Sequence, residues 1–555
     1  MQSRLKSAIL IFSLLVAFSA CEADPAVSIM LTPNTASLYI SQSLQFTARV
    51  FNSTNKEVTW SLSGTGCSGS TCGTISSTGL YSTPASVPNP AIVTVKATSV
   101  ADTSKSASAT ITILAGGNVW TWVSGSDIVN QAGVYGTKGT PAPSNIPGGR
   151  WRAAYWLDSN STLWVFGGDS RDSTGFLGLL NDLWKYDPTS NEWTWVSGAN
   201  ISYQAGVYGT KGIPAPSNIP GARNSAVSWL DSSGNLWLFG GQGYITAGNS
   251  GRLNDLWKYD PTSNEWTWIS GSNTLFQAGI YGTKGTADPL NVPGARDSAV
   301  SWLDASGQLW LFGGSGYDSV GYYADSLNDL WKFDPATLEW TWVSGSNIAF
   351  QAGVYGTKGT PAPSNVPGAR VWPISWLDSS SKLWLFGGLG LDSADHQGWL
   401  NDLWKYDPTS NEWTWFSGSK TVGQAGVYGT KGIAGSLTVP GGRYEAVFWI
   451  DSNGRFWLFG GVGIDSAGNL GDSLNDLWNY DPITLQWTWA SGSNTADQAG
   501  IYGTKGPVDP INVPGARNGA VPWVDSQGEL WIFGGYGYDS AGLNGLLNDL
   551  WRYNR

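Results

Sequence analysis

Hydrophobic and polar residues alternate in short runs along most of this chain, and from residue 118 onward the same runs return every 73 or 74 residues. Alternation of this kind is typical of a β-strand with one buried face, so each run predicts a short strand. A period of this length predicts an array of small units that bury their apolar faces against one another. Each unit contains a recurring arginine, at Arg150, Arg223, Arg296, Arg370, Arg443 and Arg517.

The second unit shows the strands that we expect in every copy. Its apolar runs predict strands over residues 225–230, 236–239, 256–259 and 266–269. Segments rich in Asp, Ser, Asn and Gly lie between the first two strands and between the last two, as tight turns require. Four antiparallel strands per unit, repeated radially, form a β-propeller, which leaves few strand edges exposed.

The two ends of the array predict how this ring closes. The last copy stops after residues 550–553, one strand short of the others. The missing Trp-Thr-Trp strand stands at the front of the array, at residues 120–122. We therefore predict an all-β fold in which residues 118–555 form a six-bladed propeller closed by an N-terminal strand.

Residues 25–114 have a different pattern, with short alternating runs such as 91–97 and 109–113. These runs predict a small all-β sandwich. The segment 66–75, followed by 79–81, resembles a bacterial Ig-like domain of group 2, which implies a spacer or adhesion module on a cell surface. Cys67 and Cys72 predict a small disulfide loop in an exported protein, with a pair of free thiols as the alternative.

The first 20 residues are typical of an export signal. Arg4 and Lys6 precede an apolar run that is too short to span a membrane. The run ends in Phe-Ser-Ala-Cys, which resembles a bacterial lipobox and implies that Cys21 is lipidated. Ordinary cleavage near Ala20 is the alternative. We expect a signal peptide over residues 1–20 and an exported lipoprotein at the bacterial cell surface or in the periplasm, held to the membrane only by its lipid anchor.

Composition narrows the class of partner. The chain has 555 residues and a net charge of −11, and only 13% of its residues are charged. It contains no basic stripe, which excludes the usual basis of nucleic-acid binding. Thirty of the 34 tryptophans fall at five positions that recur in every unit, so we interpret them as packing between blades. We interpret the recurring arginines and the aspartates of Asn-Asp-Leu-Trp in the same way, and an Arg–Asp ring linking the blades is one use for them.

The double glycine, tyrosine and tryptophan of each unit, such as Gly240-Gly241, Tyr259 and Trp266, resemble the kelch motif. The resemblance implies a propeller like the central domain of galactose oxidase. The copper site of that enzyme needs two histidines and a Tyr–Cys cross-link, whereas this chain has His396 alone and no cysteine in the propeller. We therefore expect no cofactor and no metal. A six-bladed kelch family that interconverts sialic acid anomers is the other enzymatic comparison, and Glu445 and Asp297 with neighbouring arginines could form a site of that type.

Candidate binding residues lie where the units differ. The short, uniform turns must share one face of the propeller, so the variable loops and the long connections between units emerge on the other. Non-recurring aromatic and polar residues follow the marker arginines there, where they would ring the mouth of the central channel. The candidates at these positions are Trp151, Asn224, Asp297, Trp372, Tyr444, Glu445 and Asn518, and Trp399 is added as a further non-recurring tryptophan. Asp-Ser pairs in the variable loops favour turn formation over calcium binding.

From these features we expect a surface-anchored binding or adhesion protein that recognises a glycan or a protein through the long-loop face. No nucleophile–base pair points to catalysis, because a dyad that needs histidine has one candidate at most. Two alternatives remain: a carbohydrate-active enzyme of the sialic-acid-mutarotase type, and a purely structural envelope protein.

Overall fold

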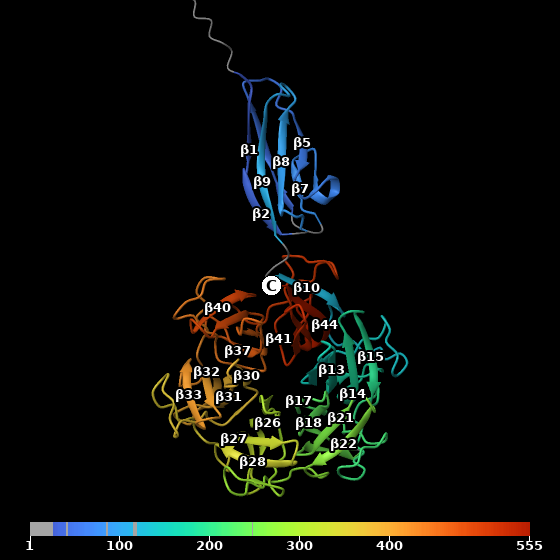
Figure 1. Cartoon of the computed structure of the whole chain (residues 1–555), viewed down its shortest axis with the longest axis vertical. Helices are drawn as coiled ribbons and strands as arrows, with labels where there is room; N and C mark the ends of the chain where they lie inside the picture. The colour runs from blue at the N-terminus through green and yellow to red at the C-terminus, as the bar shows by residue number, and fades with distance from the viewer. Residues whose placement is uncertain (1–25, 40–42, 85–86, 115–118, 247, 555) are drawn as a thin grey trace, which may run out of the picture. The chain divides into compact units, whose positions relative to one another are not determined.

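The computed structural model of the chain describes residues 26–39, 43–84, 87–114, 119–246 and 248–554 (Figure 1). The chain divides into two compact units, Met1–Gly116 and Gly117–Arg555. The predicted signal peptide and Cys21 lie outside the described residues. Within the described ranges, no helix has the length and apolar character needed to cross a bilayer.

The N-terminal unit consists of three small sheets around one apolar core. The first pairs β1 (Ser28–Thr32) with β4 (Thr47–Phe51); the second has the order β2 (Thr35–Tyr39), β9 (Ser106–Leu114), β8 (Ile92–Ser99) and β5 (Val58–Ser63). The third has the order β3 (Ser43–Gln45), β7 (Leu80–Ser82) and β6 (Thr74–Ile75). Cys67 and Cys72 form a disulfide that flanks the short 3-10 helix η1 (Gly69–Cys72), and Trp60 packs against the buried core.

The second unit is a β-propeller, so the all-β propeller prediction is confirmed. We call its repeated sheets blades 1 to 6 and label their strands a to d in chain order. Blade 1 contains β11 (Arg150–Trp151), β12 (Ala154–Leu157), β13 (Leu163–Arg171), β14 (Leu177–Asp187) and β15 (Glu192–Ser197). Strand a is divided into β11 and β12 because Arg152 turns into the left-handed region, with φ of 56°.

The other blades repeat this plan. Blade 2 contains β16 (Arg223–Asn224), β17 (Val227–Leu230), β18 (Leu236–Phe239), β19 (Gln242–Thr246), β20 (Asn249–Arg252), β21 (Leu256–Asp260) and β22 (Glu265–Ser270). Blade 3 contains β24 (Arg296–Asp297), β25 (Val300–Leu303), β26 (Leu309–Tyr317), β27 (Tyr323–Asp334) and β28 (Glu339–Ser344). Blade 4 contains β29 (Arg370–Val371), β30 (Ile374–Leu377), β31 (Leu383–Leu391), β32 (Gln397–Asp407) and β33 (Glu412–Ser417).

Blade 5 contains β34 (Arg443–Tyr444), β35 (Val447–Ile450), β36 (Phe456–Phe459), β37 (Val462–Ile464), β38 (Leu470–Gly471), β39 (Leu477–Asp481) and β40 (Gln486–Ser491). Blade 6 contains β41 (Arg517–Asn518), β42 (Val521–Val524), β43 (Leu530–Tyr538) and β44 (Asn544–Asn554), and its fourth strand is β10 (Val119–Ser124). β10 pairs antiparallel with β44, with Trp120 opposite Tyr553, so the two ends of the propeller meet in one sheet (Figure 1).

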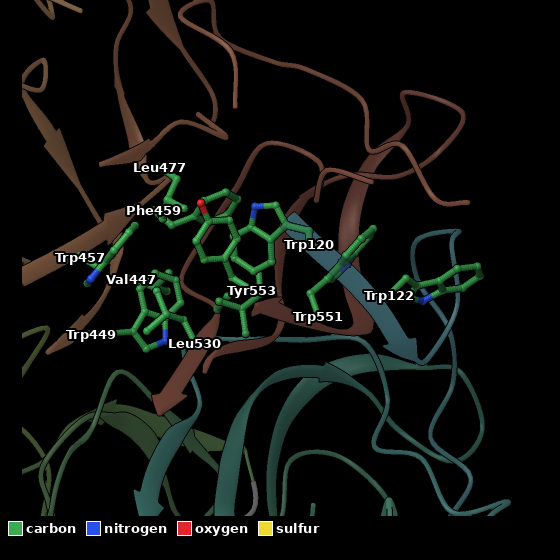
Figure 2. Packing of buried hydrophobic residues seen from close by; sticks show 12 residues of the cluster. Trp120, Trp122, Val447, Trp449, Trp457, Phe459, Leu477, Leu530, Trp551 and Tyr553 are labelled. Carbon is green, nitrogen blue, oxygen red and sulfur yellow. The ribbon is translucent and has the colours of Figure 1, made fainter. Parts of the chain in front are cut away.

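Aromatic side chains fill the space between neighbouring blades. Figure 2 shows the cluster between blades 5 and 6, where Trp120 lies between Phe459, at a ring-centroid distance of 5.2 Å, and Tyr553, at 5.0 Å. Burial of one tryptophan removes about 150–250 Å² from water, so each recurrence contributes several kcal/mol at most. The recurring tryptophans therefore serve packing, as their fixed phase predicts.

The recurring arginine and aspartate pair within one blade, and thus do not link blades as the sequence had suggested. In blade 3, Arg296 donates two hydrogen bonds to Asp329, of 2.7 and 2.8 Å, joining strand a to strand c. Tyr281, from the preceding connection, donates to the same carboxylate at 2.6 Å. Burial opposes the charge of Arg296, but the adjacent Asp329 carboxylate keeps the pKa of Arg296 above its usual value. The cluster therefore ties three segments of the chain together.

The long connections between blades make backbone hydrogen bonds to two different parts of the propeller. Each first contacts the loop between strands b and c, as where the Gly279 N–H donates to the Asp318 carbonyl at 3.0 Å. It then runs along the outer strand of the next blade, where the Gly285 N–H donates to the Trp342 carbonyl at 2.7 Å and β23 (Ala287–Asp288) pairs with β28. Part of the connection therefore covers an exposed strand edge, which the sequence did not predict.

Candidate functional site

Six residues, one from each blade, form a closed circle of backbone hydrogen bonds around the central channel. The N–H of each donates to the carbonyl of its counterpart in the preceding blade, at 2.9 to 3.4 Å, and the N–H of Arg152 closes the circle on Gly519 at 3.1 Å. All six have φ between 47° and 63°, which turns their side chains out of the strand alternation. The circle consists of Arg152, Ser225, Ser298, Trp372, Glu445 and Gly519.

These six residues hold the same backbone position but belong to five residue types, because only the two serines are alike. They line a cavity of about 170 Å³ at the channel mouth, on the face where the b–c loops emerge. The position directly before each of them also varies from blade to blade, whereas the marker arginine before that position is constant. The circle therefore places unlike side chains at one point of a symmetric frame, as binding and catalysis require.

Arg152 occupies the centre of this group. Its guanidinium lies 3.6 Å from the ring centroid of Trp151 and 4.3 Å from that of Trp372. It forms an ion pair with Glu445, a carboxylate that also accepts a hydrogen bond of 2.9 Å from the indole N–H of Trp151. Tyr444 stacks on Trp372 at a centroid distance of 5.4 Å. Residues from blades 1, 4 and 5 thus meet across the channel.

Three carboxylates around Arg152 resist ionisation. Burial raises the pKa of Glu445, and the charge of Arg152 only partly offsets this effect. Burial also raises the pKa of Asp169, and that of Asp297, with Arg152 opposing the rise in each case. Carboxyl groups with raised pKa beside an arginine are suited to proton transfer near neutral pH.

Further polar residues continue the site around the mouth. Arg252 forms an ion pair with Asp297 at 2.7 Å and donates a hydrogen bond to Ser315 at 3.0 Å. Asn224 donates to Asp169, which joins blade 2 to blade 1. Asn518 donates to Ser473 at 2.9 Å.

The structure brings most of the predicted candidates together. Trp151, Trp372, Tyr444 and Glu445 contact one another or share Arg152. Asp297, Asn224 and Asn518 lie at the same level of their own blades, opposite Ser315, Gln242 and Tyr536 on strand b.

Trp399 does not join the group. It lies on β32 opposite Leu389 and makes no aromatic ring contact in the described part of the chain.

Sequence reasoning missed three charged residues of the site. Arg152, Asp169 and Arg252 each stand at a position where most other units carry an uncharged residue. That departure from the repeat was the available signal. Arg152 was missed because the position it shares with Trp372 and Glu445 was considered only in their two units, and Asp169 and Arg252 because they lie on strands b and c, away from the marker arginines.

The aspartates of the variable loops shape turns. Asp172 accepts hydrogen bonds from the N–H groups of Thr174 and Phe176 with one oxygen, and from Ser202 with the other. No group of three or more metal-binding side chains occurs among the described residues.

Comparison with known proteins places these features in context. A profile of the KLHDC2/KLHL20/DRC7 Kelch-repeats domain matches residues 137–279 and 209–414, which together span half of the chain. A kelch repeat-containing protein of Arthroderma benhamiae is 25% identical over 306 residues, covering 52% of this chain and 41% of the relative. An N-acetylneuraminate epimerase of Escherichia coli O9:H4 is 31% identical over 166 residues, covering 26% of this chain and 43% of the relative.

The chain thus matches less than half the length of these curated relatives. Among solved structures, that of YjhT superimposes with a TM-score of 0.42 and 14% identity, over 74% of this chain and 95% of the other. We draw no functional conclusion from a structural likeness this weak.

The named relatives correct one prediction. The expectation of a surface-anchored binding or adhesion protein is wrong, because the relatives with a printed activity are sugar epimerases and favour the enzymatic alternative. The error came from demanding a histidine dyad. Proton transfer at a sugar needs only an acid and a base, and carboxylates serve in both roles.

Proposed function

The chain belongs to the kelch-repeat family, and on this premise we propose that its propeller is an enzyme that interconverts the anomers of a sugar acid of the N-acetylneuraminate type. The observation that carries the proposal is the buried Glu445 with its raised pKa, held between Arg152 and the indole N–H of Trp151 at the channel mouth. The epimerase relatives support the substrate class.

The reaction requires two proton transfers. A base removes the proton of the anomeric hydroxyl while an acid protonates the ring oxygen, and the bond between that oxygen and the anomeric carbon breaks. The open-chain ketone turns its other face and the ring closes by the reverse steps. Nothing is oxidised or reduced, and no cofactor is required.

In the proposal Glu445 is the group that exchanges the proton with the sugar. Burial raises the pKa of Glu445, so its protonated form persists to higher pH than that of an ordinary glutamate. Asp169 and Asp297, whose pKa values are also raised by burial, are the candidates for the second proton-transfer group.

Arg152 is proposed to bind the carboxylate of the sugar acid. A guanidinium binds a carboxylate with two parallel hydrogen bonds, so an acidic substrate competes with Glu445 for this partner. Release from Arg152 raises the pKa of Glu445 further and favours its acid form. Trp372, whose buried indole N–H has no partner among the described residues, supplies a hydrogen-bond donor beside Arg152.

The test is mutarotation of freshly dissolved N-acetylneuraminate, followed by NMR at a pH where the spontaneous reaction is slow. We expect the protein to accelerate equilibration and Glu445→Gln to slow it by about 100-fold or more, because general acid–base catalysis contributes this much. Glu192→Gln, on an outer strand of the same propeller, is the matched control. Equal rates with and without wild-type protein would overturn the proposal.

We also propose that the protein acts outside the cytoplasm, as a lipoprotein anchored through Cys21. The charged N-terminal segment, the short apolar run and the lipobox-like residues support this location. The Ig-like resemblance of the first unit fits a spacer between the anchor and the propeller.

A further inference from the structure

A second cavity, of about 300 Å³, lies at the junction of blades 6 and 1. We call it the junction cavity. Its volume is within the range of small-molecule sites. The residues that give it chemical character are Asn130, Trp151, Asp169, Arg171, Tyr536 and Asn544.

At two other junctions an aromatic side chain fills the equivalent space. Between blades 1 and 2, Tyr203 packs against Tyr244 at 5.4 Å, and between blades 2 and 3, Phe276 packs against Tyr317 at 5.8 Å. Asn130 holds the position of Tyr203 and Phe276, with φ of 62° against 63° and 64°. Asn130 thus stands where these two junctions carry an aromatic ring. The counterparts between blades 4 and 5 and between blades 5 and 6 are Gly423 and Asp497, so an aromatic residue fills this position at some junctions only.

The glycines that contact these side chains show that Asn130 and Phe276 occupy equivalent positions. A Cβ built on Gly251 would lie 2.2 Å from the ring of Phe276, and one built on Gly545 would lie 2.7 Å from the side chain of Asn130. The two side chains therefore rest on the same place of their blades.

Polar groups in the junction cavity have unused hydrogen-bonding capacity. The Nε of Arg171 and the Oδ1 of Asn544 are buried and have no partner among the described residues. Arg171 donates one hydrogen bond, of 3.1 Å, to the Gly175 carbonyl. A buried guanidinium nitrogen without an acceptor is costly, so the position favours a ligand oxygen.

Arg171 also differs from the other arginines of the propeller. Among the described propeller residues, every other arginine forms an ion pair with an aspartate or a glutamate, and Arg171 forms none. An unpaired guanidinium at the wall of a cavity is suited to bind an anionic group, above all a carboxylate.

Trp151 connects the junction cavity to the channel mouth. Its ring lies 5.5 Å from that of Tyr536 inside the junction cavity, while its N–H bonds to Glu445 and its ring covers Gly519 at the mouth. Trp151 therefore belongs to the lining of the junction cavity and also contacts Glu445 at the mouth.

We propose that the junction cavity binds a second acidic sugar unit, so that the substrate is a saccharide whose reducing-end unit reacts at Glu445. The carboxylate of the second unit binds Arg171, its ring packs on Trp151 and Tyr536, and its hydroxyl groups bond to Asn544 and Asn130. This inference rests on the proposed function for the identity of the reacting unit, and its test is a binding measurement that does not need catalysis.

The test compares two probes by calorimetric titration: N-acetylneuraminate, and a disaccharide of two N-acetylneuraminate units with a free reducing end. We expect the disaccharide to bind wild-type protein at least about tenfold more tightly, as one charge-assisted contact allows. Arg171→Met and Asn130→Phe should each abolish that difference. Asn130→Phe restores the filler that Phe276 supplies elsewhere at the same backbone conformation, so the variant is expected to fold.

Arg455→Met is the matched control, because it removes one positive charge at an exposed ion pair with Asp481 on strand c of its blade. It should keep the full preference for the disaccharide. Equal affinity of wild type for the two probes, or a preference that survives both Arg171→Met and Asn130→Phe, would overturn the junction cavity as a sugar site. If mutarotation is absent but the preference depends on Arg171, the binding site stands and the proposed activity falls.

Discussion

Single residues decide the chemistry at the channel mouth, and Glu445 gives the clearest pH prediction. Burial raises the pKa of Glu445 in the folded protein above its ordinary value of 4.5, with Arg152 opposing. The folded state then holds a proton that the unfolded state has lost, so this contribution to stability is complete below pH 4.5 and disappears as pH rises through the raised value. We expect the stability of wild type relative to Glu445→Gln to fall over that window. Urea unfolding of both proteins across the range measures the difference, and a difference that stays flat or grows with pH would contradict the raised pKa.

Contacts between individual residues of different blades were the feature that could least be predicted from the sequence. Trp151 and Trp372 could be selected because they depart from the repeat, yet their shared contact with Arg152 could not, since the residues come from blades 1 and 4. Only closure of the ring brings them together. The junction cavity depends on closure in the same way, because its lining residues come from blades 6 and 1.

The sequence predicted the bounds of the strands more accurately than it predicted the contacts of the site. The predicted strand 236–239 coincides with β18, and 256–259 and 266–269 differ from β21 and β22 by a residue at the ends. The predicted strand 225–230 was wrong at its start, because Ser225 leaves the β-region to donate its N–H to Arg152 in the backbone circle. Hydrophobic alternation reports burial, and it carries no information on a backbone turn of this kind.

The element scale yields a prediction for the buried pairs. Arg296 and Asp329 join strands a and c of blade 3, and both side chains are almost fully buried. Arg296→Met leaves an unpaired buried carboxylate and should lower the free energy of unfolding by about 3–5 kcal/mol. The double variant with Asp329→Asn should cost less than the sum of the two single changes, because it leaves no uncompensated charge. Denaturant unfolding measures the cycle, and Arg455→Met, at an exposed pair, should cost about 1 kcal/mol or less. Additive costs would show that the pair is not coupled.

For the whole molecule, closure of the ring is the property on which the site depends. β10 supplies the fourth strand of blade 6, and its residues Trp120 and Trp122 belong to the buried apolar cluster between blades 5 and 6. Without β10, the edge of β44 is exposed and the cluster of Figure 2 loses a tryptophan that is 1% exposed. Removal of one such ring alone costs about 3–5 kcal/mol.

Two truncated chains separate this effect from loss of the N-terminal unit. A chain that begins at residue 117 retains β10, whereas a chain that begins at residue 125 lacks it. We expect the first to unfold near the temperature of the intact propeller, because the unit Met1–Gly116 has its own core. The second should unfold at a markedly lower temperature and regain stability when a peptide of residues 117–125 is added, since the peptide can pair with β44.

The backbone circle through Arg152 and Gly519 spans the same junction of blades 6 and 1. Loss of mutarotation in the shorter chain, with recovery on addition of the peptide, would therefore connect ring closure to the arrangement of Arg152 and Glu445, while equal melting of the two chains would show that β10 does not close the propeller.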